Sequence, residues 1–228
     1  MKKNINIAFD GPAACGKSTA AKAAAKALGF LYVDTGAMYR AVAWLSIQRG
    51  IDSSDAESLA SLAENNPVTL IPDWTISKGY RVVIDGNDIT SEITSKEVNS
   101  IVSAVAAVSG VRRVLAGQQR DMAAEGGIVM AGRDITTVVM PDAELKIYLD
   151  ASVDVRARRR YLEEKELGRD VSLDEIKKSL EQRDRIDSER TDSPLMVAHD
   201  AVVINSDDMT PVDVLNEVVR LAGERALR

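Results

Sequence analysis

The sequence is poor in the residues that form disulfides, metal clusters and membrane spans. Its 228 residues include one cysteine, Cys15, and one histidine, His199. A single cysteine excludes a disulfide within the chain and fits a reducing compartment, so we expect a cytoplasmic protein. No apolar run approaches the length that spans a bilayer, and the apolar stretch after the first lysines is too short for a signal peptide.

An excess of positive charge is also absent. The formal net charge is −6 at pH 7, which argues against nucleic acid or an anionic membrane as a partner. The arginines are nevertheless crowded between Arg156 and Arg190, which indicates a local task with small anions. Nothing in the sequence signals an obligate protein partner, so we expect a monomer.

Short apolar segments alternate with amphipathic helices, a rhythm typical of a parallel sheet covered on both faces. The segments are rich in Val, Ile, Leu and Ala, as strands buried on both sides are. Helices fill the intervals, and Gly29 and Thr210 are expected to cap two of them. The sequence predicts an α/β fold of five parallel strands: Ile5–Phe9, Leu31–Asp34, Ile128–Ala131, Leu145–Leu149 and Ala201–Ile204.

One region, about 67–94, departs from this rhythm. Two β segments, Val68–Ile71 and Tyr80–Ile84, precede a turn at Asp85-Gly86-Asn87-Asp88. An Asp-Gly pair beside apolar runs is a hairpin signal. We therefore expect a small antiparallel insert within one domain that spans residues 1–228.

The clearest motif is a P-loop, G-x-x-x-x-G-K-[ST], between a strand and a helix. Glycines at its two ends permit a backbone nest whose N–H groups point at phosphate oxygens, beside the positive end of the helix. Lys17 is expected to reach the β- and γ-phosphates of ATP, and the Ser18 hydroxyl to bind Mg²⁺. The predicted ATP contacts are Gly11, Pro12, Ala13, Ala14, Cys15, Gly16, Lys17, Ser18 and Thr19.

A P-loop does not by itself name a reaction. The chain lacks D-x-x-G and N-K-x-D, which GTPases use to switch and to read guanine. It also lacks the long apolar strand with adjacent acids that motor ATPases need. The strand that ends at Asp150 carries one acid, which we expect to cap the following helix. These absences weaken the switch and motor readings and favour a small-molecule kinase.

Two further clusters follow predicted strands, and the carboxyl ends of parallel strands share one crevice. Asp34, Tyr39 and Arg40 form a credible acceptor-binding set, or else a capped helix start. Arg133 is suited to hold a phosphate bidentately. Asp134 would hold Mg²⁺ through water or orient Arg133, and a plain ion pair is the alternative.

Two arginine-rich segments complete the set. On a helix, Arg156 and Arg160 share a side and would stabilise the transferred phosphoryl group from a closing lid at about 155–170. Arg158 and Arg159 are expected to be solvated or paired. Arg183, Asp187 and Arg190 also share one helical face, for donor or acceptor contacts or merely as a solvated face.

The motifs together resemble bacterial cytidylate kinases over essentially the whole chain. The matches are Asp10-Gly11-Pro12, the segment from Asp34 to Arg40, the segment from Gly132 to Val139, and Ala157-Arg158-Arg159-Arg160. The turn at residues 85–90 is similar to one in the family's β insert. The sequence departs from the family where Thr35 replaces an equally expected serine and where the insert is longer near Trp74–Gly79.

The resemblance implies a P-loop nucleoside monophosphate kinase fold, with acceptor binding in residues 35–110. It implies transfer of a phosphoryl group from ATP to CMP or dCMP, with Mg²⁺. It assigns acceptor contacts to Thr35 and Ser103, and contacts with the CMP phosphate to Arg40, Arg112 and Arg133. It places Arg183 and Asp187 at cytosine and ribose, Asp134 with phosphate and metal, and Arg156, Arg160 and Arg190 at the lid and the transferred group.

Two alternatives stay open at this point. Another P-loop kinase, acting on shikimate or a different monophosphate, would share the core but lack the β insert. A nucleotide-sensing module would bind ATP without turnover of an acceptor.

Overall fold

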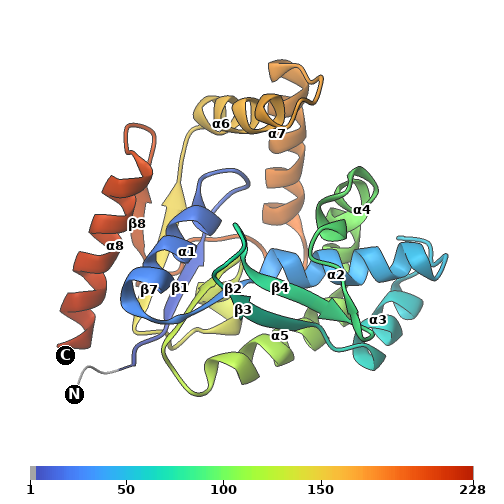
Figure 1. Ribbon diagram of the computed structural model, residues 1–228, viewed down its shortest axis with the longest axis horizontal. Helices are drawn as coiled ribbons and strands as arrows, with labels where there is room; N and C mark the ends of the chain where they lie inside the picture. Colours follow the sequence, from blue (N-terminus) through green and yellow to red (C-terminus); the bar gives the residue numbers. More distant parts are fainter. Residues whose placement is uncertain (1–3, 228) are drawn as a thin grey trace.

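The structure, a computed structural model, describes residues 4–227 (Figure 1). A five-stranded sheet lies at its centre, and all neighbouring strands are parallel. The predicted fold class is confirmed, with small shifts at strand ends: β1 starts at Ile7 and includes Asp10. The strand order is β2 (Leu31–Asp34), β6 (Ile128–Ala131), β1 (Ile7–Asp10), β7 (Leu145–Asp150) and β8 (Val202–Asn205).

Helices cover both faces of this sheet. Ile7 and Phe9 pack with α1 (Lys17–Leu28) and α8 (Pro211–Ala226). Ala8, between them, packs on the other face with α5 (Ser109–Ala123) and the π-helical turn Ile135–Val139. Strand residues thus alternate between two apolar layers, which explains why the sequence shows continuous apolar runs.

The helix caps agree with the sequence prediction at two places and correct it at a third. Gly29 ends α1 with φ 72°, and Thr210 forms a capping box with Asp213 at the start of α8. Asp150 does not cap the next helix. It remains in β7, and Ser152 caps α6 (Val153–Glu166) by accepting a hydrogen bond from the Val155 amide, because the helix begins two residues later than predicted.

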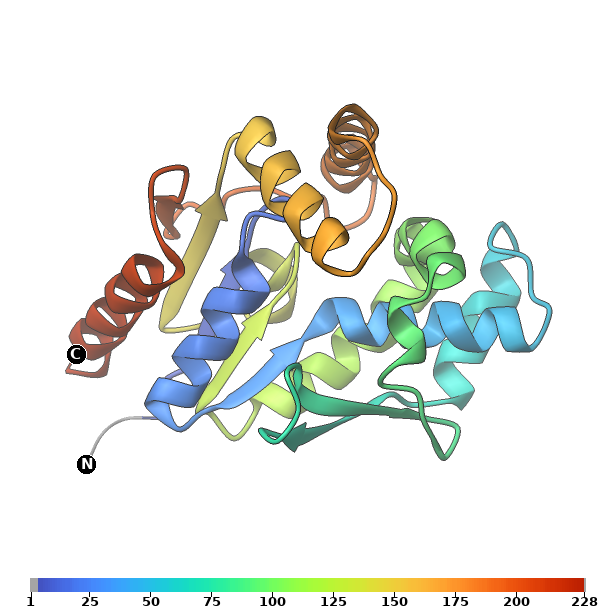
Figure 2. The ribbon, with the colours of Figure 1, turned by 45° about the horizontal axis from the view of Figure 1, so that its top comes forward.

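A second group of elements lies beyond the β2 edge of the sheet (Figure 2). The predicted antiparallel insert is present, and the side chains of Tyr80, Val82 and Ile84 in its middle strand are buried. Tyr80 also stacks obliquely on Tyr32 of β2, with ring centroids 5.7 Å apart. The elements are α2 (Thr35–Gln48), α3 (Ala56–Asn65), β3 (Thr69–Asp73), β4 (Gly79–Ile84), β5 (Asn87–Asp88), a 3₁₀ turn at Glu92–Thr94 and α4 (Lys96–Ala107).

Helices α6 and α7 (Leu173–Glu189) form a hairpin above the carboxyl ends of the strands (Figures 1 and 2). Ser172 and Glu175 form a capping box at the start of α7. The hairpin packs on the P-loop through a small apolar cluster whose buried members are Ala13, Ala157, Ile176 and Leu180.

Candidate active site

The P-loop between β1 and α1 has the backbone geometry that its glycines predict. Gly11 has φ 144°, and a Cβ there would lie 2.0 Å from the carbonyl oxygen of Leu149. Gly16 has φ 97°. Ala14 also adopts a left-handed conformation, with φ 59°, which costs an ordinary residue about 1–2 kcal/mol. A non-glycine residue keeps such a conformation only where its neighbours hold it.

Lys17 lies beneath this loop rather than in solvent. Its Nζ donates a hydrogen bond of 2.5 Å to the Pro12 carbonyl and lies 3.4 Å from Cys15 Sγ. Burial, reinforced by the nearby Arg133 charge, lowers the pKa of Lys17 to about 8. The amine is therefore poised to gain from an anionic ligand.

Asp10, which the sequence prediction used only as part of a motif, ties two parts of the site together. Its fully buried carboxylate accepts hydrogen bonds from the amides of Ile135 (2.9 Å) and Thr136 (2.7 Å) and from the Thr136 hydroxyl (2.6 Å). Burial raises the pKa of Asp10. The contacts fix the turn that follows Arg133 and Asp134 against the strand that leads into the P-loop.

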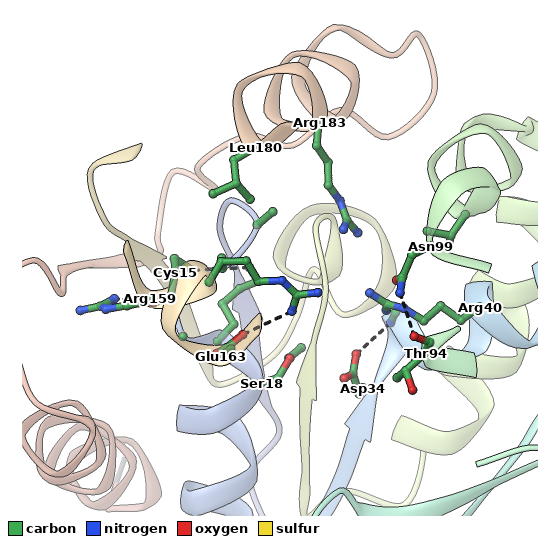
Figure 3. A pocket seen from close by; sticks show the side chains of 18 of the residues that line it. Cys15, Ser18, Asp34, Arg40, Thr94, Asn99, Arg159, Glu163, Leu180 and Arg183 are labelled. Carbon is green, nitrogen blue, oxygen red and sulfur yellow. Dashed lines mark hydrogen bonds and ion pairs between the residues drawn. The ribbon is translucent and has the colours of Figure 1, made fainter. Parts of the chain in front are cut away.

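A cavity of about 1140 Å³ opens between the P-loop, α2, α4 and the α6–α7 hairpin (Figure 3). It is large enough for two ligands of ordinary size. Gly11, Pro12 and Arg156 do not reach its wall. The predicted site residues that line it are Ala13, Ala14, Cys15, Gly16, Lys17, Ser18, Thr19, Asp34, Thr35, Tyr39, Arg40, Ser103, Arg112, Arg133, Asp134, Arg160, Arg183, Asp187 and Arg190.

At the α2 end of the cavity, Asp34 is both a helix cap and a cavity residue, so the two readings of this cluster are compatible. Its carboxylate accepts hydrogen bonds from the Gly36 amide (3.0 Å) and the Tyr80 hydroxyl (3.2 Å). Thr35 donates to the Ala131 carbonyl (2.9 Å), which joins α2 to β6. Arg40 projects into the same space (Figure 3). Burial lowers the pKa of Arg40.

A network of buried ion pairs lies deeper in the cavity. Arg112 and Asp134 form a hydrogen-bonded pair in which both side chains are nearly inaccessible. Arg133 Nε donates to Asp187 Oδ2 at 2.8 Å, so the two segments that carry them meet. Arg190 follows the end of α7 and lies 3.7 Å from Asp187 and 4.0 Å from Asp134. Arg133 is therefore ion-paired and also lines the cavity, but its partner is Asp187, while Asp134, which was expected to orient it, pairs with Arg112 instead. The predicted phosphate contact of Arg133 stays a prediction.

The network leaves cationic groups without full compensation. Buried nitrogens without a hydrogen-bond partner in the described residues include Arg112 Nε, Arg183 Nε and Arg190 Nη2. Arg183 points down from α7 into the cavity (Figure 3). Burial and the charges of Arg133 and Arg40 lower its pKa to about 10. Within residues 4–227 Arg183 forms no ion pair, and a buried charge without a partner is costly, so this part of the cavity favours an anionic ligand.

Arg156 and Arg160 of α6 were both predicted to face the transferred group, but only Arg160 lines the cavity. Arg160 lines the cavity and pairs with Glu163 and Glu164. Arg156 is buried behind the P-loop, where it donates to the Ala13 and Ala151 carbonyls. The two residues lie on nearly the same side of α6 but one turn apart along its axis. Arg156, nearer the start of the helix, therefore meets the loop at Ala13, and Arg160, one turn further on, reaches the cavity.

Several cavity residues were not predicted from sequence. Lys78 and Tyr80 reach the cavity from the insert, and Asn99 reaches it from α4. Arg159 donates to Ser206 and to the Cys15 carbonyl (3.4 Å) and also borders the cavity. The expectation that Arg159 is paired is met. In the sequence, only the dense run of arginines pointed to a role for Arg159. Nothing in the sequence indicates that Ser206 is its partner.

The site fits Mg²⁺ bound mainly by a ligand. Ser18 is exposed on the cavity wall at the start of α1, and its hydroxyl is a hard oxygen donor. Within residues 4–227 no group of three or more His, Cys, Asp or Glu side chains is arranged to hold a metal. Mg²⁺ commonly takes one or two protein oxygens and fills its other positions with phosphate and water, so a single hydroxyl suits it.

Among the described residues, no single helix has the length and apolar character to cross a membrane. The pair Lys96–Ala107 and Ser109–Ala123 meets both criteria only in combination, and it is bent by 92°.

The fold is similar to that of a shikimate kinase from Acinetobacter baumannii, solved in complex with shikimate. The TM-score is 0.50 at 15% identity, over all of this chain and 97% of that one. This likeness supports the fold alone.

Similarity in sequence goes further. A cytidylate kinase from Lysinibacillus sphaericus (strain C3-41) is 45% identical over 227 residues, the full length of both chains. A bifunctional pantoate ligase/cytidylate kinase from Synechococcus sp. (strain JA-3-3Ab) is 50% identical over 94% of this chain, which spans only 40% of that protein. The family model described as cytidylate kinase matches residues 7–224. The chain therefore belongs to the cytidylate kinase family.

Proposed function

We propose that the chain transfers the γ-phosphoryl group of ATP to CMP or dCMP, giving ADP and CDP or dCDP. One observation carries the proposal. Cationic side chains from distant segments, Arg40, Arg133 and Arg183, line the same cavity as the P-loop and Lys17. Such a set is suited to bring two polyanions together and offset their repulsion.

The P-loop side would bind the donor. Its amides and the start of α1 form an anion nest, and Lys17 lies where it can exchange the Pro12 carbonyl for a phosphate oxygen. Ser18 would hold Mg²⁺, which neutralises phosphate charge when bound.

The opposite wall would bind the acceptor. Arg40, Arg112 and Arg133 would hold the CMP phosphate, and Thr35 and Ser103 would contact the nucleotide. Arg183 and Asp187 would contact cytosine and ribose. Their support is position: all of them line the cavity, and the labelled Arg40 and Arg183 reach into it across from Ser18 (Figure 3).

No general base is required for this reaction. A phosphate oxygen is already ionised near neutral pH, so the protein needs only to align it in line with the γ-phosphorus and to exclude water. His199, the one histidine, is 94% exposed at its side chain and has no part in the cavity. Arg160 and Arg190 would stabilise charge on the transferred group, and Asp134, which pairs with Arg112, would hold that arginine toward the phosphate.

We also propose that residues 155–170 close as a lid over residues 35–110. Arg160 is then released from Glu163 and Glu164 toward the phosphates. We propose further that the chain acts on nucleotides as a monomer in the cytoplasm, where the buried Cys15 would stay reduced.

A coupled assay of ADP formation tests the proposal with CMP, dCMP, UMP, AMP and shikimate as acceptors. We expect kcat/KM to be highest for CMP or dCMP. Preference for shikimate or another monophosphate would assign the chain to a different kinase class. ATP binding without turnover of any acceptor would make it a nucleotide sensor.

A further inference from the structure

The α6–α7 hairpin holds the backbone of the P-loop at Ala13 from two directions. Asp184 of α7 accepts a hydrogen bond from the Ala13 amide through Oδ1 (3.3 Å). Arg156 of α6 donates to the Ala13 carbonyl through Nη1 (3.1 Å). The two side chains also pair with each other, with Nη1 and Oδ2 2.7 Å apart. Asp184, Arg156 and Ala13 thus form a closed set of contacts, named here the Ala13 clamp.

The clamp is sheltered from solvent, so its polar contacts are stronger than contacts on the surface would be. The Arg156 side chain is 7% exposed and that of Asp184 is 23% exposed. Ala13 also packs in an apolar cluster with Ala157, Ile176 and Leu180 from the same hairpin. Charge-assisted hydrogen bonds in such surroundings are stronger than those on the surface.

The clamp decides which way the loop's peptide units face. In a trans peptide the C=O and the following N–H point in opposite directions. Asp184 holds the Ala13 N–H outward, so the Pro12 carbonyl faces the opposite way, where Lys17 Nζ meets it at 2.5 Å. Arg156 holds the Ala13 carbonyl outward, which turns the Ala14 N–H toward the other side of the peptide. The left-handed conformation of Ala14 is therefore held by its neighbour.

The same hairpin carries groups that face the cavity. Arg183 is adjacent to Asp184 in α7, and Asp187 follows one turn later and pairs with Arg133. Arg160 follows Arg156 by one turn in α6. A shift of the hairpin that moves these groups toward an acceptor must also move the partners of the Ala13 backbone.

We infer that Asp184 is a positioning residue that couples acceptor binding to the conformation of the P-loop. The inference rests on the proposed function, since it takes ATP and CMP as the two ligands. Binding of CMP through Arg183 and Asp187 fixes α7, the clamp then fixes the Ala13 peptides, and affinity for the triphosphate rises. By linkage, ATP raises affinity for CMP by the same factor.

Calorimetric titrations test this coupling in the full chain. The affinity for CMP is measured with and without saturating β,γ-methylene ATP, and the ratio of the two Kd values is the coupling factor. We expect Asp184→Asn to lower this factor at least tenfold, because the amide keeps one acceptor oxygen but loses the charge that pairs with Arg156. The Kd for CMP alone should change less than threefold.

Two controls separate positioning from structure. Glu181→Gln removes one negative charge from an exposed position of α7 and should leave the coupling factor unchanged. Asp184→Glu, which restores the charge, should recover part of the coupling. An unchanged factor in Asp184→Asn overturns the inference, whereas a wild-type chain that does not phosphorylate CMP overturns the proposed function instead.

A measurement on the wild type covers the case in which the variants do not fold. Amide hydrogen exchange followed by NMR reports the Ala13 N–H directly. Addition of CMP alone should slow its exchange at least tenfold, while the amide of Val218 in α8 stays unchanged. An exchange rate of the Ala13 amide that does not change when CMP is added would contradict the coupling.

Discussion

The proposed donor and acceptor sides of the cavity are built in different ways. The donor side comes from one continuous segment, the P-loop, of which residues 13–19 line the cavity, and it would use backbone amides with one lysine. The acceptor side is assembled from α2, the insert, α4, the segment after β6 and α7, and uses side chains. A contiguous backbone nest is fixed by local geometry, whereas an assembled wall depends on every element that contributes to it. Substitutions should therefore affect the two sides differently.

The largest effect is expected on the donor side. Lys17→Ala should lower kcat by about 10³-fold, since removal of one preorganised donor to developing charge costs about 10²–10³ and the lysine is also the loop's own cation. The melting temperature should be retained or raised, because the amine is buried and its pKa is depressed. The coupled assay and circular dichroism measure both, with Lys26→Ala on the exposed side of α1 as the control. A folded Lys17→Ala chain with near-normal turnover would contradict the mechanism.

Arg183→Ala should affect the acceptor side alone. We expect kcat/KM for CMP to fall about 100-fold, the cost of a charged hydrogen bond to a ligand, while the Kd of ATP without CMP stays within threefold. Thermal stability should stay equal or rise, because Arg133 and Arg40 repel this buried guanidinium. Arg185→Ala, an exposed position on α7, is the matched control. Equal losses for ATP and CMP would show that the two sides are not separable.

The pH dependence of ATP binding sharpens the comparison further. Because the pKa of Lys17 is lowered to about 8, the free protein loses this charge as pH rises through 8. The Kd of ATP should rise about tenfold between about pH 7 and 9, and Lys17→Arg should remove this rise since arginine stays charged. Cys15→Ser should keep the rise in Kd, which would show that the Cys15 thiol does not cause it. The Kd of CMP alone should not follow the same curve.

The same shift has a consequence for folding. The unfolded chain binds more protons than the folded chain between about pH 8 and the ordinary lysine value of 10.5. The contribution of Lys17 to the free energy of unfolding therefore increases with pH across this window. Urea titrations of wild type and Lys17→Ala at both ends of the window measure it.

The smallest effect is expected where the insert meets the acceptor wall. Tyr80→Phe removes the hydrogen bond that the hydroxyl donates to Asp34, so KM for CMP should rise about threefold to fivefold, in keeping with about 1 kcal/mol for such a bond. Steady-state kinetics with CMP varied is sufficient. Tyr148→Phe on β7, away from the cavity wall, is the control. No change in KM would restrict the insert to a packing role.

The sequence by itself determined the elements whose reasons are local. Leu31–Asp34 and Ile128–Ala131 were predicted with their observed bounds because a strand buried on both faces needs an unbroken apolar run. The P-loop could be recognised because its glycines, lysine and serine lie within one short segment of the sequence. The hairpin at Asp85-Gly86 was predicted from its turn residues, and the resemblance to a family supplied roles for scattered arginines.

Tertiary structure decided what depends on contacts between distant residues. No spacing in the sequence indicates that Arg156 turns toward Ala13 while Arg160 faces the cavity, or that Asp10 receives the amides of Ile135 and Thr136. Such contacts arise from helix rotation and strand register, which are set by packing of the whole core. The sequence fixes which charges exist, and only the folded chain decides which are paired with each other and which are left for a ligand.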